Sequence, residues 1–526
     1  MEESIINDLP DDLMLKIFSL LPMFKDSVAS RLISKRWKDG WKLVPDVIFD
    51  DRDKSCGSLL AFMSFVYGSL LINKPRVLER LHLKLSRKHS ASDIDFLVNI
   101  AVDRSVRKLR IQRFGETLEL PSCLSTCITL RSLILHEVRI KVVPTCLLLL
   151  SLKSLHLLSV QFSGDRSFAS LLGSCPSLEY LIINQTQVDS AKMLEVIAPW
   201  FRLPSLKSLH LLSVKFSGYV SVASLLQSCP VLENLVVKQT KCCNVMFRVA
   251  PYRIFLSSLR RLHLFSVKFF SGESAECLLR NCKALEDLVI HRTKDDNVKI
   301  FNIKVPTLKS LSIENSRRKH AYVQESHGFV INAPALEKLN FKDTFSNFLI
   351  FEYMHEVTKA NIEVICDQSE KFIGSLTSVQ HLSLCCLTSE TPYPKGRFFF
   401  FLEHLELCTC SAGWANLLAC LLDDFPRLQS LKLKSQHSAR YNDPTTNLWN
   451  EPTVVPKCLS THLEILEWRQ YEGTEQEKNV AAYILANAPC LKMATFSTRC
   501  RNKYHRMLRK LKKLKRVSET CQLVFE

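Results

Sequence analysis

Aliphatic residues recur along this chain in one spacing, L-x-x-L-x-L, in which other aliphatic residues can replace leucine. The phrase SLKSLHLLSV at 151–160 contains this spacing and returns unchanged at 205–214. Residues 151–186 and 205–240 align without gaps, and 26 of 36 positions are identical. Each copy holds two such patterns, which begin at Leu152 and Leu178 in the first copy, so the underlying period is 26 residues.

One L-x-x-L-x-L pattern is called a rung here, and rungs follow one another at steps that mostly fall between 22 and 28 residues. A weaker rung, Val357-x-x-Ala360-x-Ile362, lies in the longest gap. This regular succession is typical of leucine-rich repeats. The other rungs begin at Leu78, Val106, Leu130, Leu152, Leu178, Leu206, Leu232, Leu259, Leu285, Leu308, Leu336, Val379, Leu402, Leu428 and Leu463.

The rung spacing predicts a strand, because its last two aliphatic positions lie two residues apart and point to the same face. A single repeat cannot bury that face, but stacked repeats form a curved parallel sheet with a continuous core. Segments such as FASLLGSCP (168–176) and VASLLQSCP (222–230) predict short outer helices ended by proline. We therefore expect an α/β solenoid from about residue 70 to 440. Leu155, Leu209 and Leu262 should be buried in register.

The N-terminal segment has a different pattern, an aliphatic stripe bounded by prolines. Leu13, Ile17, Leu20 and Leu21 recur at helical spacing. Pro10 suits the first position of a helix, and Pro22 ends the stripe. Residues 9–51 are predicted to form three short helices, whose core is too small to be stable alone. Part of their apolar surface is therefore left for a partner.

This segment resembles an F-box, and SKRWKDGWKLVP (34–45) is similar to the variant common in plant proteins. The resemblance implies docking on a Skp-type adaptor and, through it, on a cullin. Gly40 departs from the family pattern, which has an aliphatic residue there, and should loosen the third helix. The residues that match, and that the resemblance assigns to adaptor binding, are Leu9, Pro10, Leu13, Ile17, Leu20, Leu21, Pro22, Val28, Ser34, Lys35, Arg36 and Trp37.

A second resemblance lies near the C-terminus, where residues 448–496 are similar to the FBD domain of plant F-box/leucine-rich-repeat proteins. We interpret this domain as a cap, since the last repeat of a solenoid needs an atypical outer face. The predicted organisation is an F-box (1–52), a linker with a first helical cap (53–77), leucine-rich repeats (78–440) and the FBD cap (441–526). The matching residues are Trp449, Asn450, Glu451, Pro452, Val455, Pro456, Cys458, Leu459, Leu463, Glu464, Trp468, Tyr471, Gly473, Cys490, Leu491 and Lys492.

The 526-residue chain is basic, with a formal net charge of +18. Residues 499–516, RCRNKYHRMLRKLKKLKR, hold many of its cations. Met507, Leu508, Leu511 and Leu514 recur there at helical spacing, which favours an amphipathic cap helix with a solvated basic face. A nuclear localisation signal and a nucleic-acid surface stay open as alternatives.

The 20 cysteines do not have the spacing of zinc ligands. They form doublets, such as Cys385-Cys386, and one C-x-C of Cys408 and Cys410. We expect free thiols in a reducing compartment that pack as small hydrophobes. No metal and no cofactor is expected. Cys175, Cys229 and Cys282 recur at one position of the repeat and should lie under a helix end.

Histidines recur in Leu-His-Leu at His82, His156, His210 and His263, on the expected inner, concave face. The last three lie on alternate strands and so about 9–10 Å apart, whereas one metal ion needs its nitrogens at about 2 Å. Chelation is therefore excluded, and inheritance of a tolerated surface residue by duplicated repeats explains the recurrence. The functional alternative is a contact surface for a partner, and we expect a target protein of net negative charge to meet this concave face or the loops at its rim. The candidate target-binding residues are Ser154, His156, Ser208, His210, Arg261 and His263.

Catalytic motifs are absent from the sequence: it has no Gly-rich phosphate loop, no H-E-x-x-H and no nucleophile elbow. We recognise no signal peptide. The most apolar run, 145–160, is interrupted by Lys153 and His156, so no membrane span is expected. The resemblances imply the non-catalytic substrate-recognition subunit of a Skp–cullin–F-box ubiquitin ligase, in the cytoplasm, the nucleus or both. The alternative is a basic nuclear scaffold, or a nucleic-acid-associated repeat protein, that does not act in ubiquitination.

Overall fold

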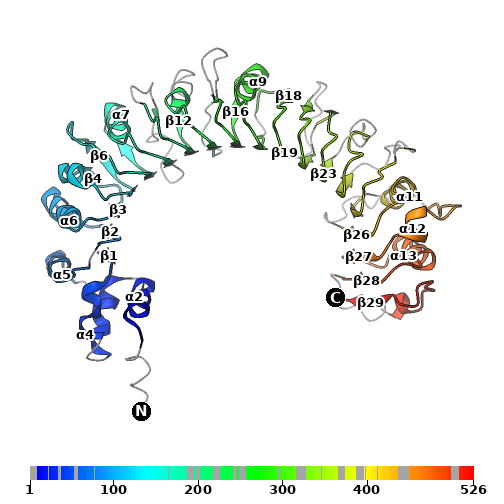
Figure 1. Cartoon of the computed structure of the whole chain (residues 1–526), viewed down its shortest axis with the longest axis horizontal. Helices are drawn as coiled ribbons and strands as arrows, with labels where there is room; N and C mark the ends of the chain where they lie inside the picture. The colour runs from blue at the N-terminus through cyan, green and yellow to red at the C-terminus, as the bar shows by residue number, and fades with distance from the viewer. Residues whose placement is uncertain are drawn as a thin grey trace. The chain divides into compact units, whose positions relative to one another are not determined.

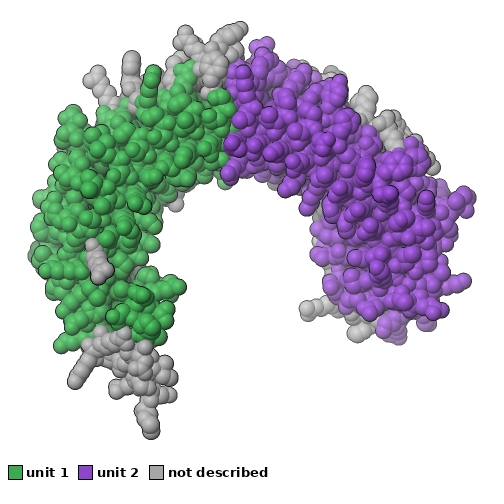
Figure 2. Space-filling view, viewed as in Figure 1, with its two compact units in different colours: residues 1–259 green, residues 260–526 purple. Residues whose placement is uncertain are grey.

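The structure is a computed structural model (Figure 1). It divides into two compact units, residues 1–259 and 260–526, which are coloured separately in Figure 2. The residues that it describes are 9–21, 23–33, 37–52, 57–75, 77–163, 165–185, 195–196, 202–216, 225–240, 246–247, 256–293, 296–315, 327–344, 346–364, 374–386, 396, 398–411, 413–435, 449–498 and 509–526.

Unit 1 begins with short helices and continues as a parallel sheet. The helices are α2 (Asp11–Leu20), α3 (Phe24–Ala29), α4 (Trp37–Gly40) and the 3-10 turns η1 (Ser30–Leu32) and η2 (Trp41–Leu43). The sheet holds β1 (Asp46–Asp50), β2 (Arg80–Lys84), β3 (Lys108–Gln112), β5 (Ser132–His136), β7 (Ser154–Leu158), β9 (Tyr180–Asn184), β11 (Ser208–Leu212) and β13 (Asn234–Lys238). The other elements are α5 (Leu59–Ile72), α6 (Ala91–Asp103), β4 (Thr117–Glu119), η4 (Ser122–Thr126), β6 (Arg139–Val142), β8 (Gln161–Phe162), α7 (Asp165–Gly173), β10 (Glu195–Val196), β12 (Lys215–Phe216) and β14 (Met246–Phe247).

Unit 2 contains a longer parallel sheet. Its strands are β15 (Arg261–Phe265), β17 (Asp287–His291), β19 (Ser310–Asn315), β21 (Lys338–Asp343), β23 (Lys359–Val364), β24 (His381–Cys386), β25 (His404–Cys408), β26 (Ser430–Lys434), β27 (Ile465–Arg469), β28 (Met493–Phe496) and β29 (Gln522–Phe525). The other elements are β16 (Lys268–Phe269), α9 (Gly272–Arg280), β18 (Ile300–Lys304), β20 (Gly328–Asn332), β22 (Phe348–Glu352), α11 (Trp414–Asp424), α12 (Lys457–Thr461) and α13 (Glu475–Asn487).

Within each unit the rungs stack without any slip in register. In unit 1 one row of core residues runs from Val47 on β1, through Leu155 and Leu209, to Leu235 on β13. In unit 2 the equivalent row runs from Leu262 on β15 to Leu523 on β29. Leu155, Leu209 and Leu262 are all fully buried, which confirms the predicted repeat register.

The first position of every rung predicted from the sequence is also buried, from Leu78 to Leu463. The weak rung is real, because Val357, Ala360 and Ile362 are all buried and β23 forms there. The sheet is longer than the predicted ladder of rungs. It includes β1, which lies inside the range 1–52 predicted for the F-box, and β28 and β29 beyond the last predicted rung.

The outer layer is only partly helical. Leu171 and Leu172 on α7 are buried, as are Leu225 and Leu226, so both predicted outer segments pack inward as expected. Elsewhere short strands replace helices: β4, β6 and β8 form one outer sheet of unit 1, and β18, β20 and β22 form one of unit 2. In Figure 1 these outer elements cover one face of each unit's main sheet. The opposite face of the sheet, which the outer elements do not cover, is called the open face.

The N-terminal helices form their own small core and join the sheet. Met14 and Phe18 of α2 are buried, and the ring of Phe18 lies 5.2 Å from that of Trp37. A Cβ at Gly40 would lie 2.9 Å from Phe18. The side chains of Phe18 and Met14 therefore occupy the space that a side chain at position 40 would need. Close packing fills this space. The α-helix α4 ends at Gly40 and the backbone continues as η2, so a loosening of the third helix by Gly40 stays a prediction.

A buried carboxylate fastens β1 to the loop after β2. Asp51 is fully buried and accepts hydrogen bonds from the backbone amides of Ser86 and Arg87 at 2.8 Å. The Ser86 hydroxyl donates at 2.6 Å, and Nε2 of the buried His89 lies at 2.8 Å. Burial opposes ionisation, but the hydrogen bonds from His89, Ser86 and Arg87 hold the pKa of Asp51 well below its ordinary value.

We expect Asp51→Asn to lower the free energy of unfolding of unit 1 by about 2–3 kcal/mol, because the amide cannot accept all these hydrogen bonds. A carboxyl with a depressed pKa stabilises the fold above its unfolded pKa of about 4 and loses this effect as the pH falls. The difference between wild type and variant should therefore shrink below about pH 4. Urea titrations of both chains at pH 7 and at acid pH measure it, and a difference that is unchanged at acid pH would contradict the assignment.

The FBD segment continues the stack instead of standing apart from it. Trp468 on β27 is fully buried, and its ring contacts Tyr471 at 5.2 Å and Phe496 at 6.2 Å. Helix α13 covers these strands and begins with a capping box between Thr474 and Glu477. The strand β29 pairs with β28, so the sheet extends beyond the segment that resembles the FBD domain.

Among the described residues, no helix is both long enough and apolar enough to span a membrane.

Candidate functional site

Helix α2 has two apolar faces of different character. One face, with Met14 and Phe18, is buried. The other carries Leu13, Ile17 and Leu20, whose exposed fractions are 46%, 38% and 77%. These three residues follow the spacing of one helix face and form what we call the α2 stripe. An apolar stripe left exposed on so small a domain is typical of a binding surface.

The other residues assigned to adaptor binding are placed less uniformly. Pro10 is exposed, while Leu9, Leu21 and Val28 are half-buried. Trp37 is buried against Phe18, so it supports the small core and offers little surface to a partner. Pro22, Ser34, Lys35 and Arg36 lie outside the described residues. The sequence reasoning did not find three further exposed apolar residues, Leu32, Ile33 and Leu43.

The candidate target-binding residues lie on the open face of the sheets, which is the face opposite the core. Ser154 and His156 are half-buried neighbours with their polar atoms 3.0 Å apart, and His210 is also half-buried. Ser208 is buried and offers almost no contact area, contrary to expectation. In unit 2, Arg261 is exposed and Nε2 of His263 lies 2.8 Å from Asp287. Hydrogen bonding to His263 lowers the pKa of Asp287.

His82 differs from the other histidines of the row. It lies on the open face of β2 in register with Arg110 of β3, but it is buried, and its Nε2 atom has no hydrogen-bond partner among the described residues. Burial, aided by the positive charge of Arg110, lowers the pKa of His82 to about 3. His82 is therefore neutral and belongs to the packing of this face rather than to its contact surface.

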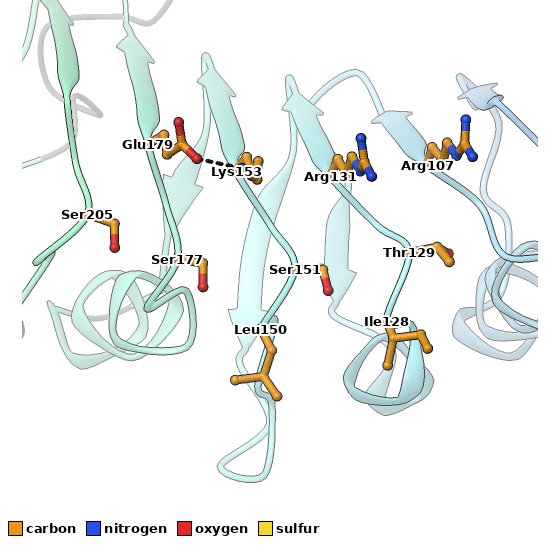
Figure 3. A pocket seen from close by; sticks show the side chains of 10 residues that line it. All are labelled: Arg107, Ile128, Thr129, Arg131, Leu150, Ser151, Lys153, Ser177, Glu179 and Ser205. Carbon is orange, nitrogen blue, oxygen red and sulfur yellow. Dashed lines mark hydrogen bonds and ion pairs between the residues drawn. The ribbon is translucent and has the colours of Figure 1, made fainter.

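A groove of about 500 Å³ lies at the edge of unit 1 where the strands begin (Figure 3). Hydroxyl groups line it in one row, from Thr129, Ser151, Ser177 and Ser205 on successive repeats. The hydroxyls of the last three make no hydrogen bond within the described part of the chain. Each of these three repeats therefore presents a serine hydroxyl, free to donate and accept a hydrogen bond, at the equivalent position of the repeat.

A row of charges runs beside these hydroxyls (Figure 3). It is formed by Arg107, Arg131, Lys153 and Glu179. Arg107 forms an ion pair at 2.6 Å with Glu79, which lies outside the groove. Lys153 forms an ion pair at 2.7 Å with Glu179. Arg131 is exposed and has no ion-pair partner among the described residues. Ile128 and Leu150, both exposed, form an apolar lip.

The sequence contained a signal for this groove. The hydroxyl residues directly precede the first aliphatic position of each rung, and the charged residues directly follow it. The Leu-His-Leu pattern directs attention to the strand positions within each rung. The hydroxyl and charged residues lie on either side of the first aliphatic position, so this pattern does not include them. We call this surface the hydroxyl–cation groove.

A second groove, of about 270 Å³, lies on the open face of unit 2. It includes His381 and His404, whose rings stack at 4.4 Å with an interplanar angle of 3°. Burial, followed by the positive charge that His404 can carry, lowers the pKa of His381. The neutral form of His381 is therefore favoured in this stack.

The cysteines that recur in the repeat are core residues, as predicted. Cys175, Cys229 and Cys282 are buried, and each thiol donates to the carbonyl four residues earlier at 3.1–3.2 Å. Burial raises the pKa of all three thiols to about 12. They are therefore neutral and unreactive.

Three other cysteines come together although their spacing in the sequence did not predict it. Cys385 follows directly on Leu384 of β24, and Cys408 on Leu407 of the adjacent strand, whose leucines are in register. The chain then returns so that Sγ of Cys410 lies 3.5 Å from Sγ of Cys385. The three Sγ atoms all lie within 4.8 Å of one another. Hydrogen bonding to Cys408 and Cys410, together with burial, raises the pKa of Cys385.

Comparison with known proteins places these features in a family. The F-box domain family matches residues 6–47, the leucine-rich repeat family matches 151–176, 205–230 and 258–282, and the FBD family matches 451–496. A putative FBD-associated F-box protein of Arabidopsis thaliana is 53% identical, with all of both chains covered. An F-box/FBD/LRR-repeat protein of the same plant is 43% identical over 99% of this chain and 92% of its own.

A solved internalin of Listeria monocytogenes has 15% identity and a TM-score of 0.36, over 72% of this chain and 90% of that one. The full-length similarity to the plant proteins is far stronger, and it extends through the N-terminal helices, the repeats and the cap. The chain is a member of the plant family of F-box/FBD/leucine-rich-repeat proteins.

Proposed function

We propose that this chain is the substrate-recognition subunit of a Skp–cullin–F-box ubiquitin ligase. The α2 stripe carries the proposal, because Leu13, Ile17 and Leu20 expose apolar surface on a domain that can bury it only against a partner. The F-box family assigns this surface to a Skp-type adaptor, which in turn binds a cullin. Co-purification with a Skp-type adaptor and a cullin tests the proposal, and a folded chain that recovers neither contradicts it.

In this role the chain performs no chemistry. The matched families describe a docking module, a repeat scaffold and a cap. Ubiquitin transfer would be carried out by the other subunits of the ligase, while this chain holds a target protein near them. No cofactor is required for holding a target.

We propose that the target binds along the hydroxyl–cation groove of unit 1 through an acidic segment. Arg131 supplies a cation without an ion-pair partner among the described residues, and Ser151, Ser177 and Ser205 supply free hydroxyls at regular spacing. Strands about 4.8 Å apart set that spacing. An extended acidic segment that crosses the strands could therefore meet hydroxyls on successive repeats.

We expect Arg131→Glu to weaken target binding at least about tenfold, because it places a like charge against the acidic segment. Arg260→Glu is the matched control, since Arg260 is exposed and follows a rung leucine but lies outside the groove. An adaptor-defective chain serves as bait, and quantitative mass spectrometry compares the proteins recovered by each version. Recovery of the same proteins by the bait with and without Arg131→Glu would contradict the groove assignment.

The alternative function, a basic nuclear or nucleic-acid-associated scaffold, is favoured by one observation. Arg509, Lys510, Lys512, Lys513, Lys515 and Arg516 are all exposed, whereas Leu511 between them is buried. This part of the predicted amphipathic segment does present a basic face; Met507 and Leu508 lie outside the described residues. Retention on DNA that persists at high salt, with no adaptor recovered, would favour the scaffold.

We place the chain in the cytoplasm, the nucleus or both, where a Skp–cullin ligase acts. The free thiols throughout its core are compatible with a reducing compartment. A fluorescent fusion observed in plant cells reads the compartment directly.

A further inference from the structure

The cluster of Cys385, Cys408 and Cys410 differs from the other buried cysteines in its contacts. The recurring cysteines of the repeat each stand alone and donate to a helix carbonyl. In the cluster the sulfur atoms face one another instead, and the thiol of Cys385 lies 3.5 Å from that of Cys410. Packing alone accounts for an isolated buried thiol. It does not explain why three thiols converge on one point.

The cluster has the dimensions of a metal site. A metal–sulfur bond of about 2.3 Å, as zinc makes, puts the sulfurs of one metal about 3.8–4.0 Å apart for tetrahedral or trigonal geometry. The three Sγ atoms lie within 4.8 Å of one another, and the distance between Sγ of Cys385 and Sγ of Cys410, 3.5 Å, is close to that value. Small side-chain rotations would therefore make all three sulfurs equidistant from one ion.

The position in the fold provides both rigidity and access. Cys385 and Cys408 are buried at the ends of two paired strands, β24 and β25. Cys410 is only half-buried, so one side of the cluster is open to solvent. A site held by strands loses little entropy when it binds an ion, and the open side provides the entry path that a metal site needs.

The ligand set indicates which cation fits. Thiolates select soft cations such as Cu(I) and Zn(II). Structural zinc sites in proteins use four protein ligands. Among the described residues no histidine or carboxylate joins the three thiols within the same distance. The carboxylate of Glu363, which is in register with Cys385, is paired with Lys342 at 3.1 Å. Three sulfur ligands suit the three-coordinate geometry that Cu(I) accepts.

We propose that Cys385, Cys408 and Cys410 form a three-thiolate binding site for a soft monovalent cation, Cu(I). This departs from the expectation from the sequence that the chain holds no metal site. The C-x-C of Cys408 and Cys410 supplies two ligands from one strand end, and Cys385 supplies the third from its neighbour. The site is independent of the adaptor surface and of the hydroxyl–cation groove, which both belong to unit 1.

The test is an anaerobic titration of the reduced full-length chain with Cu(I) against a chromogenic Cu(I) chelator. Wild type should retain one equivalent at a chelator concentration that strips Cu(I) from Cys410→Ser. The loss of a direct ligand should lower the affinity more than about 100-fold, which is beyond the effect of an outer-shell change. Cys146→Ser and Cys490→Ser, which remove two exposed thiols, are the matched controls and should retain the ion.

Alkylation mapped by mass spectrometry provides a readout that does not depend on the folding of any variant. With Cu(I) bound to wild type, the three cluster cysteines should be protected together, while Cys146 and Cys490 stay reactive. Equal retention by wild type and Cys410→Ser would overturn the proposal, as would protection of unrelated cysteines. Zn(II) that displaces Cu(I) from the same three cysteines would overturn the assignment of the cation.

Discussion

A chain that carries Leu13→Asp together with Ile17→Asp should bind a Skp-type adaptor about a thousandfold more weakly than wild type. Central apolar anchors of an interface each cost about 2 kcal/mol or more when removed. Two anchors amount to about 4 kcal/mol, and each 1.4 kcal/mol is tenfold in the dissociation constant. Both side chains are exposed on the α2 stripe, so the substitution acts on the interface rather than on the core. Titration calorimetry with a purified plant adaptor measures the loss.

Controls on the same helix separate docking from folding. Ser19→Ala, an exposed polar position of α2 that lies outside the spacing of the stripe, should leave adaptor binding unchanged. Leu9→Ala with Pro10→Ala should weaken binding by more than about tenfold, because it trims the edge of the same surface. The fluorescence of the buried Trp37 and Trp41 reports whether the small core is intact. Equal adaptor binding by a folded Leu13→Asp, Ile17→Asp chain would mean that this F-box docks by another surface.

The same variant should behave as a trap. The sheet of unit 1 stacks on itself and joins the N-terminal helices through β1 and the adjacent packing of Phe24 on Phe49. Target binding should therefore persist when adaptor binding is lost. The target would accumulate on the chain without being ubiquitinated, which makes this variant the proper bait for identifying it.

The sequence predicted those parts of the fold in which one residue pattern has one physical outcome. Every rung needs large aliphatic residues at its core positions, so Leu155, Leu209 and Leu262 could be assigned to the core from their spacing alone. Even the weak rung around Ala360 was recoverable, because its neighbours fixed where it had to lie. The F-box and the cap were recognised because their residues recur in known families.

Other parts of the fold could not be predicted, because their residues overlapped another motif or showed no regular spacing. The rung of β1 lies inside the range assigned to the F-box, so Val47 and Phe49 were not counted among the rungs. The outer strands β20 and β22 carry no period of their own. Only the structure shows that Gly328 is needed there, since a Cβ would collide with the carbonyl of Phe348.

The candidate sites show the same division. The α2 stripe was foreseen, because a helical period separates its exposed residues from Met14 and Phe18. The hydroxyl–cation groove was present in the sequence, but its residues, such as Arg131 and Ser151, flank the rungs rather than occupy them. The cysteine cluster depended on the pairing of β24 with β25, and the sequence spacing of Cys385 from Cys408 contains no such information.

Leu262→Ala should lower the free energy of unfolding by about 2–5 kcal/mol, through lost burial and the cavity that remains. The adjacent Arg261→Ala should have almost no effect, because Arg261 is exposed on the open face. Leu155→Ala and Leu209→Ala should cost a similar amount, since all three side chains are fully buried at the same position of the repeat. Urea titrations followed by circular dichroism compare the four variants with wild type.

The repeat architecture is tested more sharply by where Leu262→Ala destabilises the chain than by how much free energy of unfolding is lost. In a stack where each repeat contacts only its neighbours, a lost core residue weakens its own repeat and the two beside it. Hydrogen exchange in Leu262→Ala should therefore accelerate in β15 and β17, which pair through Leu262 and Leu288, before it changes in β27 and β28. Uniform acceleration across the chain would mean that the molecule unfolds as one cooperative body. The rungs would then be parts of a single core, and the independence of target binding from adaptor docking would lose its physical basis.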